Sequence, residues 1–359
     1  MNNMSKTVLV TGGCGFIGTN FVRLILDKRK DWSVINLDKL TYAGNLENLK
    51  NVTGNPQYHF VRGDICDFDL VERLLIEHDV DTVVHFAAES HVDRSITGPD
   101  EFFRTNVFGT FNLLEVARKK WLKEQRTDQL DRYRFLHVST DEVYGSLGDS
   151  GYFTETTSYD PRSPYSASKA SSDHFVRAYF HTYGLPILMT NCSNNYGPYQ
   201  FPEKLIPLVL NNALKGESLP VYGDGGNVRD WLYVQDHCEA IIRVLEKGQI
   251  GESYNIGGHN EKKNLEVVEF LCDILDRKVG MLPLNTPRRS LITFVKDRLG
   301  HDRRYAINAS KIADELGWTP KMTFEKGMDQ TVDWYLNNQE WMNSVMDGSY
   351  REYYEKMYG

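Results

Sequence analysis

The sequence predicts an α/β fold, with a doubly wound parallel sheet followed by a smaller mixed α/β region. Three observations support this prediction. Short apolar segments alternate with helix-like segments through the first half of the chain, a glycine-rich turn joins the first of each kind, and the composition shifts toward Asn, Pro and Tyr after Asn191. Such alternation is typical of a parallel sheet with helices on both faces. With 359 residues, the chain can form one large or two medium domains.

The strands expected in the first half are apolar runs that end at polar or small residues, and helix-like segments lie between them. The strands are expected at 7–12, 33–38, 58–64, 82–88, 134–140 and 185–191, and the helices at 16–28, 67–78, 100–125 and 165–183.

Beyond Asn191 the pattern is less regular. We expect a loop over 192–207, strands at 219–223, 230–234 and 253–258, helices at 235–247 and after Asn264, a long loop over about 276–304 and a helical tail after Phe324. We therefore assign 1–191 to a first domain, to which 231–255 returns, and 192–359 mostly to a second region. No flexible linker separates the two, so a ligand is expected in the cleft between them.

The turn after the first strand, "VTGGCGFIG", contains Gly12, Gly15 and Gly18. Glycine permits the tight turn and the close approach of a pyrophosphate, and the following helix N-terminus offers free N–H groups. Asp38 ends the second strand, where a carboxylate accepts hydrogen bonds from an adenosine ribose and repels a 2′-phosphate. The pattern predicts a Rossmann-like domain that binds NAD rather than NADP. Asp64, after the third strand, could reach the adenine, although both acids could also be turn or cap residues.

"YSASK" places Tyr165 and Lys169 at positions i and i+4, on one face of a helix whose first turn accommodates Pro164. A neighbouring ammonium lowers the pKa of a tyrosine and makes it a usable base for a sugar hydroxyl. The spacing alone is common by chance, but here it follows a dinucleotide loop.

Several stretches carry a resemblance to a known family. The TGxxGxxG loop, "HFAAESHVDRS", "HVSTDEVYG" and "YSASKASSD" resemble the extended short-chain dehydrogenase/reductase family. "DKLTYAGNLENL", "NNYGPYQFPEKLIP", "NVRDWLYVQDHC" and "DRLGHDRRYAIN" are similar, more narrowly, to its dTDP-glucose 4,6-dehydratase subfamily. The resemblance runs nearly end to end. It departs modestly at Leu299, where the subfamily has proline.

This resemblance implies the NAD-dependent dehydration of dTDP-glucose to dTDP-4-keto-6-deoxyglucose. In the implied mechanism, Tyr165, supported by Lys169, takes the C4 hydroxyl proton while Thr140 bonds the C4 oxygen. Asp141 is the acid at the C6 oxygen and Glu142 the base at C5. Burial and the proximity of Glu142 should keep Asp141 protonated. An arbitrary Asp-Glu pair would more simply be a solvated turn.

The resemblance also implies the binding residues. Those for NAD are Gly12, Gly15, Phe16, Ile17, Gly18, Asp38, Lys39, Leu40, Thr41, Asp64, Ile65, Ala87, Ala88, Thr105, Tyr165, Lys169 and Asn195. Those for the substrate are Ser90, Thr140, Asn194, Glu203, Lys204, Tyr222, Arg229, Asn264, Arg298 and His301, with Arg303 and Arg304 as further candidates for the diphosphate. Each cation could instead be a surface charge, Tyr222 a core aromatic residue and Asn264 a helix cap.

Composition and charge limit the classes of partner that the chain is expected to bind. A net charge of −8 argues against non-specific nucleic-acid binding. The five cysteines are scattered, as in a cytoplasmic protein with reduced thiols, and the N-terminus resembles neither a signal peptide nor a membrane span. His85, His91 and His301 do not have metal-ligand spacing, and we expect no metal. The resemblance implies a homodimer paired through the helices at 100–125 and 165–183.

Four alternatives remain open at this stage. UDP-glucose could replace dTDP-glucose, because one methyl group changes binding by only about 1–3 kcal/mol. A nucleotide-sugar 4-epimerase has no need of Asp141 and Glu142, and a UDP-glucuronate decarboxylase gains little from a second acid. A non-catalytic NAD-binding protein could lose Tyr165 or Lys169, and both are present.

Overall fold

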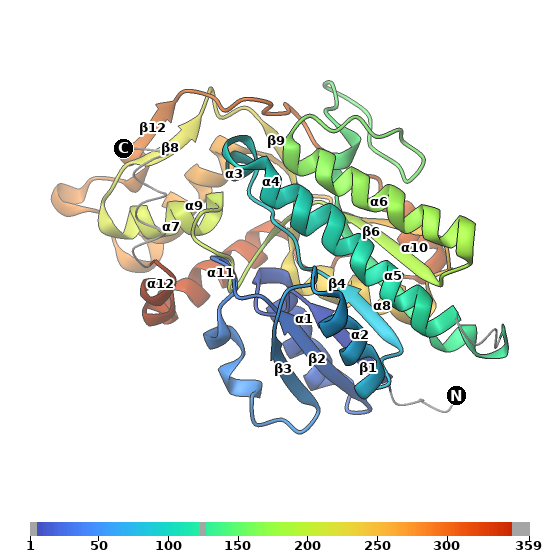
Figure 1. Ribbon diagram of the computed structural model, residues 1–359. Coiled ribbons are helices and arrows are strands. Elements are labelled where there is room, and N and C mark those ends of the chain that lie inside the picture. The colour runs from blue at the N-terminus through green and yellow to red at the C-terminus, as the bar shows by residue number, and fades with distance from the viewer. Residues whose placement is uncertain (1–5, 123–126, 347–359) are drawn as a thin grey trace.

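The computed structural model describes residues 6–122 and 127–346. A sheet lies at its centre (Figure 1). The strand order is β10-β6-β5-β4-β1-β2-β3, and all neighbours pair in parallel. This confirms the predicted fold class. The strands are β1 (Lys6–Thr11), β2 (Trp32–Asp38), β3 (Tyr58–Arg62), β4 (Thr82–His85), β5 (Arg134–Thr140), β6 (Ile187–Cys192) and β10 (Ser253–Ile256).

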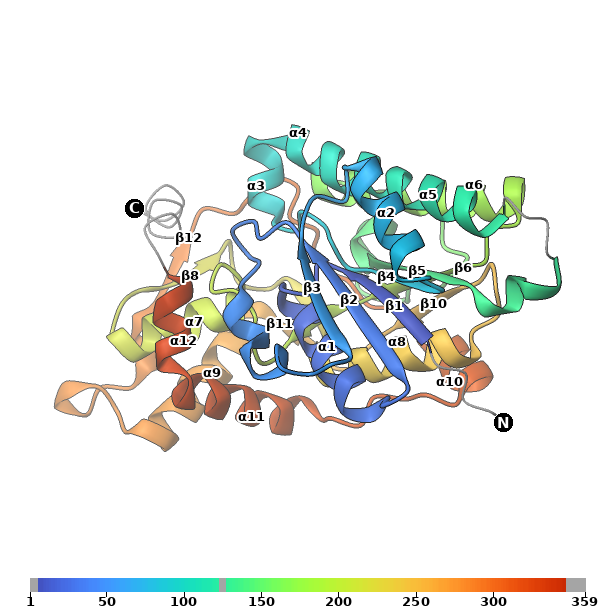
Figure 2. The ribbon, with the colours of Figure 1, turned by 60° about the horizontal axis from the view of Figure 1, so that its bottom comes forward.

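Helices cover both faces of this sheet, as Figure 2 shows. One layer contains α2 (Phe68–Glu77), α5 (Thr110–Leu122) and α6 (Pro164–Tyr183), and its apolar residues pack on the sheet around Leu114 and Val176. The other contains α1 (Phe16–Lys28), α8 (Val234–Lys247) and α10 (Ser310–Leu316), with Phe21 and Ile241 in its core. Strand β10 therefore joins the central sheet from the second half of the chain, and helix α8, from the same half, packs on its face. The division of the chain at residue 191 stays a prediction.

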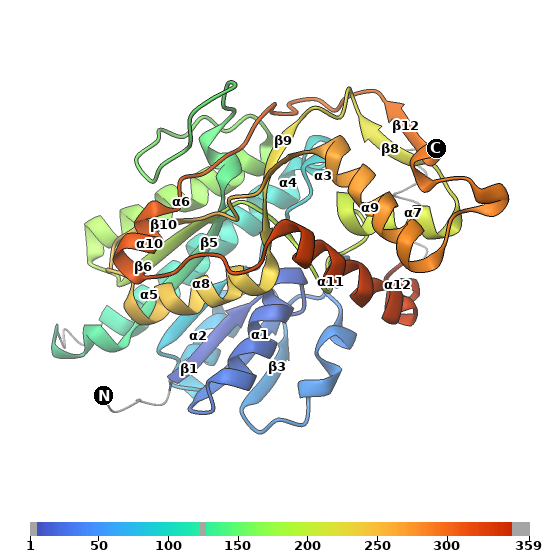
Figure 3. The ribbon, with the colours of Figure 1, turned by 180° about the vertical axis from the view of Figure 1, so that it is seen from behind.

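The second region lies to one side of the central sheet (Figure 3), and it has its own core around Tyr196, Val268 and Met328. A three-stranded sheet joins β7 (Asn194–Tyr196), β9 (Val228–Tyr233) and β11 (Glu261–Lys263), and a two-stranded sheet joins β8 (Leu219–Tyr222) and β12 (Ile292–Val295). Its helices are α7 (Leu205–Lys215), α9 (Asn264–Val279), α11 (Phe324–Asn337) and α12 (Gln339–Val345).

Several expected elements were wrong in detail. Strand β7 lies inside the expected loop 192–207, while α9 and β12 occupy part of the expected loop 276–304. Strands β7 and β12 are short and have little periodic pattern, and partners distant in sequence stabilise them: β12 pairs with β8, and β7 with β9.

The helix expected at 100–125 is not uniform. Helices α3 (Val92–Thr97) and α4 (Pro99–Phe102) precede a π-helical segment, Phe103–Gly109, which continues into α5. Inside this segment the Asn106 carbonyl accepts hydrogen bonds from the hydroxyls of Thr110 and Ser172, both at 2.6 Å. Side chains that compete for a backbone carbonyl in this way favour a wider helical turn. In the part of the chain that the structure describes, we find no helix long and apolar enough to cross a membrane.

Candidate active site

A pocket lies at the carboxyl ends of the central parallel strands, where α/β sheets bind ligands. All five expected catalytic residues line it, namely Thr140, Asp141, Glu142, Tyr165 and Lys169. Every expected cofactor residue except Leu40 also lines it. Leu40 instead donates its backbone N–H to Asp38 Oδ1 at 2.8 Å.

The glycine-rich turn forms the floor of this pocket. Gly12 has φ +72°, and a Cβ built there would lie 2.7 Å from the Ala87 backbone nitrogen. A Cβ on Gly18 would collide with the Gly12 carbonyl. Both positions therefore require glycine, and α1 begins directly behind the turn, at Phe16. The arrangement leaves backbone N–H groups available to an anion, as in dinucleotide-binding turns.

Asp38 connects the end of β2 to the glycine-rich turn. Its Oδ2 accepts a hydrogen bond from the Cys14 N–H at 2.8 Å, and burial raises the pKa of the carboxyl. The neighbouring Lys39 does not neutralise it, because the ammonium lies 2.9 Å from Asp64 Oδ2. Both acids therefore bind the loops at this edge of the sheet: Asp38 accepts hydrogen bonds from the Cys14 and Leu40 N–H groups, and Asp64 pairs with Lys39.

Polar groups that line the pocket and lack a hydrogen-bond partner also fit the binding of NAD. In residues 6–122 and 127–346, Asn194 Oδ1 and Asp141 Oδ2 are buried and have no hydrogen-bond partner. Buried polar atoms are rarely left unsatisfied, so such atoms in a pocket indicate a polar ligand. Together with the glycine-rich turn and Asp38, they match a dinucleotide and a bound sugar.

Helix α6 orients Tyr165 and Lys169. Ser163 and Ser166 form a reciprocal capping box at its start, with both side chain to backbone distances 3.0 Å. Burial raises the pKa of the Tyr165 phenol well above its usual value, Glu142 raises it further, and a hydrogen bond with Thr140 lowers it. The sequence predicts a pKa lowered by Lys169; in this structure burial is the largest influence on the phenol, and its pKa is raised instead.

Asp141 and Glu142 begin a tight turn directly after the end of β5. Thr140 Oγ1 caps the 3₁₀ turn Asp141–Tyr144 by accepting the Glu142 N–H at 3.3 Å. The side chains of both acids line the pocket that contains Tyr165. The pair is therefore not a solvated surface turn.

The two carboxyl groups have different electrostatic surroundings. Burial, Glu142 and Asp230 raise the pKa of Asp141 well above its usual value. Burial also raises the pKa of Glu142, but positive groups oppose this increase, in the order Arg298, Arg229 and Lys204. Neighbouring cations favour a carboxylate and neighbouring acids favour a carboxylic acid. The arrangement therefore favours a protonated Asp141 beside an ionised Glu142.

The expected substrate residues separate into two groups. The first group lines the pocket: Ser90, Thr140, Asn194, Glu203 and Lys204. The second lies outside the lining: Tyr222, Arg229, Asn264, Arg298 and His301. Arg229 and Arg298 nevertheless lower the pKa of Glu142, so their positive charges lie near this carboxyl group.

Contacts explain the placement of the second group. Tyr222 donates to Asp93 Oδ2 at 3.3 Å, and Arg298 lies 3.6 Å from Asp93 Oδ1. His301 packs edge-to-face on Tyr222 with ring centroids 6.1 Å apart. Asn264 is the first residue of α9, and the cap before it is Lys263, so the simple cap interpretation of Asn264 is wrong.

The two further arginine candidates lie in other ion pairs. Arg303 pairs with Asp224 at 2.8 Å, and Arg304 pairs with Glu261 at 2.8 Å. Neither lines the pocket.

Sequence reasoning missed several pocket residues. Among them are Glu89, Ser139, Cys192, Gln200 and Phe201, all within one to three residues of an expected site residue. Their proximity to the quoted motifs is the signal that could have identified them.

Comparisons with known proteins agree with this site. A family model described as GDP-mannose 4,6 dehydratase matches residues 9–331. A dTDP-glucose 4,6-dehydratase from Xanthomonas campestris pv. campestris (strain B100) is 62% identical over 349 residues, covering 96% of this chain and 97% of the relative.

Solved structures give the same result. The dTDP-glucose 4,6-dehydratase from Bacillus anthracis, in complex with NAD, is 50% identical, with a TM-score of 0.83 and coverage of 95% of this chain and 99% of that chain. A Streptomyces venezuelae dTDP-glucose 4,6-dehydratase with NAD bound is 48% identical, with a TM-score of 0.86 and coverage of 94% and 99%.

Proposed function

The chain belongs to the GDP-mannose 4,6-dehydratase family, and we propose that it converts dTDP-glucose to dTDP-4-keto-6-deoxyglucose with NAD as cofactor. One observation carries this proposal more than any other. The adjacent acids Asp141 and Glu142 line the same pocket as Tyr165, above a dinucleotide-type turn. Dehydration requires an acid and a base in addition to Tyr165, whereas epimerisation at C4 requires neither.

The first step removes the proton of the C4 hydroxyl. Tyr165 is the base, and Thr140 hydrogen-bonds the C4 oxygen. Lys169 supports the ionised form of Tyr165 from one helical turn further along α6. When bound, NAD supplies the oxidation at C4 and the later reduction at C6, so the overall reaction has no net redox change. We propose that the cofactor residues named from the sequence, which line this pocket apart from Leu40, hold it.

The second step removes water across C5 and C6. A ketone at C4 makes the C5 proton acidic, and Glu142 takes that proton as a carboxylate. Asp141 donates a proton to the C6 oxygen, which leaves as water. The raised pKa of Asp141, caused by burial, Glu142 and Asp230, supports its role as the acid. Cations near Glu142 support its role as the base.

The diphosphate of the substrate needs positive groups in an acidic protein. Lys204 lines the pocket, and the positive charges of Arg229 and Arg298, from the second region, lie near Glu142. We propose that these three side chains bind the diphosphate. Arg303 and Arg304 are poorer candidates because each already pairs with a carboxylate.

A product assay tests the function and its alternatives. The purified protein is incubated with dTDP-glucose, UDP-glucose, UDP-glucuronate and UDP-galactose, and the products are weighed by mass spectrometry. We expect loss of water from dTDP-glucose. Loss of water from UDP-glucose would extend the substrate range. Loss of carbon dioxide from UDP-glucuronate would indicate a decarboxylase, and unchanged mass with altered configuration an epimerase. Absence of water loss from either glucose substrate would contradict the proposal.

We also propose that the chain forms a homodimer through the face of α5 and α6, which lie side by side in Figure 1. Exposed aromatic residues gather there, with Phe111 6.1 Å from Phe175 and 6.2 Å from Phe108 between ring centroids. Exposed apolar patches of this kind indicate an interface. Sedimentation should show a dimer that Phe111→Glu dissociates, whereas Phe294→Glu, at another exposed phenylalanine, should leave it intact.

We infer, finally, that the protein works in a reducing compartment such as the cytoplasm. All five cysteines are free thiols. This supports the expectation drawn from their scattered positions.

A further inference from the structure

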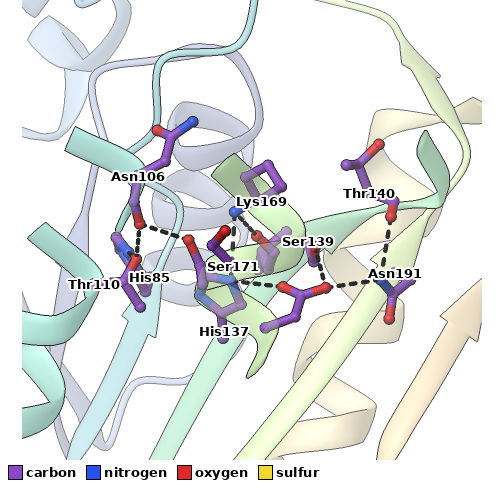
Figure 4. Close-up of polar contacts among 12 residues, drawn as sticks. His85, Asn106, Thr110, His137, Ser139, Thr140, Lys169, Ser171 and Asn191 are labelled. Carbon is purple, nitrogen blue, oxygen red and sulfur yellow. Dashed lines mark hydrogen bonds and ion pairs between the residues drawn. The ribbon is translucent and has the colours of Figure 1, made fainter. Parts of the chain in front are cut away.

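A chain of buried polar groups continues from Lys169 into the sheet (Figure 4). Lys169 Nζ donates to the Val138 carbonyl at 2.9 Å and lies 3.5 Å from His137 Nε2. His137 Nε2 in turn lies 3.1 Å from Asp173 Oδ1. The side chains of His137 and Asp173 are fully buried, and neither lines the pocket. The proposed mechanism does not yet use them.

Asp173 is arranged as a buried carboxylate anion. Its Oδ2 accepts hydrogen bonds from Ser139 Oγ at 2.8 Å and from Tyr159 OH at 2.9 Å. Burial alone would raise the pKa of this carboxyl, but the hydrogen bonds and the nearby His137 and Lys169 lower it below its usual value. A carboxylate that accepts several hydrogen bonds stays ionised even when buried.

The other titratable groups that face Lys169 are uncharged. Burial lowers the pKa of His137 to about 4, and burial raises the pKa of the Cys192 thiol on β6 to about 12. Tyr165, on the same helix, has its pKa raised by burial. Burial also lowers the pKa of His85, on β4, whose ring centroid lies 5.3 Å from that of His137.

The hydrogen bonds of His85 fit the neutral ring that its lowered pKa favours. Thr110 donates its only hydroxyl proton to the Asn106 carbonyl at 2.6 Å, so it must accept a proton from His85 Nε2 at 2.9 Å. His85 Nδ1 then accepts from Thr11 Oγ1 at 2.7 Å. With Cys192, Tyr165 and both imidazoles neutral, Asp173 is left as the anion among the groups that face Lys169.

A buried ammonium needs a compensating negative charge. Burial lowers the pKa of Lys169, and Asp173 acts in the opposite direction. A carbonyl partner alone would leave the charge poorly compensated in a low-dielectric interior. A neutral amide at residue 173 could hold the neighbouring side chains in place equally well. The negative charge of Asp173 therefore indicates a role beyond structural support.

We propose that Asp173, together with His137, is a positioning residue for the first step of the reaction: the negative charge of Asp173 keeps Lys169 in the ammonium form, and His137 holds the Asp173 carboxylate in place through its Nε2–H. This inference rests on the proposed function, because it assigns Lys169 to the support of Tyr165. Asp173 and His137 themselves do not touch the substrate.

The sign of the effect follows from the charges. Asp173→Asn removes one negative charge and keeps the shape of the side chain. Lys169 then loses its proton at lower pH. While Lys169 is still charged, the Tyr165 phenolate also forms at lower pH, because a repelling charge has gone. The acidic limb of the pH–rate profile follows ionisation of Tyr165, and the basic limb follows loss of the Lys169 proton. Both limbs should therefore move to lower pH, by about one pH unit.

The experiment follows two readouts on the holoenzyme across pH. One is the single-turnover absorbance of reduced cofactor after addition of dTDP-glucose. The other needs no substrate: the ultraviolet phenolate absorbance, taken as the difference from the same protein carrying Tyr165→Phe. In Asp173→Asn, both limbs of the rate profile and the phenolate midpoint should shift to lower pH. Tyr159→Phe is the matched control, since it removes a hydrogen bond to Asp173 and keeps the charge; its limbs should stay at the wild-type pH.

Each outcome bears on the inference. If Asp173→Asn lowers the rate with unmoved limbs and an unmoved phenolate midpoint, Asp173 is a structural brace and the inference is wrong. If this variant does not fold, His137→Leu and His137→Gln replace it. The limbs should shift in the leucine variant and less in the glutamine variant, whose amide can still donate to Asp173, and unmoved limbs in both would overturn the inference. A wild type that releases no water would instead contradict the proposed function, and the phenolate titration would still test Asp173.

Discussion

Tyr42 donates a hydrogen bond to Glu203 Oε1 at 2.9 Å, although 161 positions separate the two residues. Arg94 completes the contact: its Nε lies 3.2 Å from Glu203 Oε2, and its guanidinium lies 3.9 Å above the Tyr42 ring. Tyr42 belongs to the loop after β2, whose neighbours Thr41 and Ala43 line the pocket, and Glu203 comes from the second region. The contact therefore ties the two parts of the chain together over the proposed NAD site.

Tyr42→Phe should weaken the binding of NAD. The variant leaves the buried carboxylate of Glu203 without one donor, which costs about 1–3 kcal/mol. We expect a lower melting temperature and less NAD retained after gel filtration, measured by absorbance of the released nucleotide. Tyr152→Phe, which removes the same oxygen from an exposed tyrosine, serves as the control and should retain NAD like the wild type.

Glu142→Gln should separate the two halves of the reaction. An amide cannot take the C5 proton, so exchange of that proton with deuterated solvent should fall about 100- to 10,000-fold. Oxidation at C4 depends on Tyr165 and should remain detectable as reduced cofactor. Proton exchange at the wild-type rate would show that another group is the base.

Asp141→Asn should show the opposite separation. Its amide cannot protonate the C6 oxygen, so release of water should become slow while exchange at C5 continues. Mass spectrometry for the product and deuterium content for the exchange distinguish the two variants. Fast water release by Asp141→Asn would assign the acid to a different residue.

Asp141 should also make stability depend on pH. Its pKa is raised in the folded protein, so the folded state holds the proton after the unfolded chain has released it. The stability from this group is fully present below the unfolded pKa of about 3.9 and is lost as pH rises through the folded pKa. Asn cannot ionise, so the stability of Asp141→Asn relative to the wild type should increase between about pH 4 and pH 8, by roughly 1.4 kcal/mol for each pH unit that separates the folded pKa from the unfolded one. Urea denaturation at about pH 4 and pH 8 measures this, and an advantage that does not grow with pH would contradict it.

Gly12→Ala should damage the cofactor site locally. The residue would have φ +72° and a Cβ 2.7 Å from the Ala87 backbone, so the turn must move. We expect loss of NAD together with a destabilisation of about 1 kcal/mol or more, measured by nucleotide content and melting temperature. Gly54→Ala is the control, because a Cβ there meets nothing within 4 Å.

Local sequence patterns predicted much of the molecule. Apolar runs and the glycines at 12, 15 and 18 are read within a few residues of each other, and the parallel sheet and its nucleotide-type turn follow from them. The expected catalytic residues line one pocket because parallel strands end at the same edge of a sheet.

Two short strands of the second region, β7 and β12, were not predictable in this way, whereas β8 and β9 were expected from the sequence. β7 and β12 exist because distant strands pair with them, and periodicity cannot reveal such partners. In the π-helical segment, the Asn106 carbonyl similarly accepts a hydrogen bond from Ser172, which lies on another helix.

The sequence by itself determined the fold class, the nucleotide-type turn and the set of chemical groups available for catalysis. The tertiary structure decided how those groups differ from one another. Asp141 and Glu142 are adjacent acids of nearly equal strength in the sequence, and their difference arises from Asp230 near Asp141 and from Arg298 and Lys204 near Glu142. Burial and charge act through space, so protonation depends on neighbours that only the folded chain brings together.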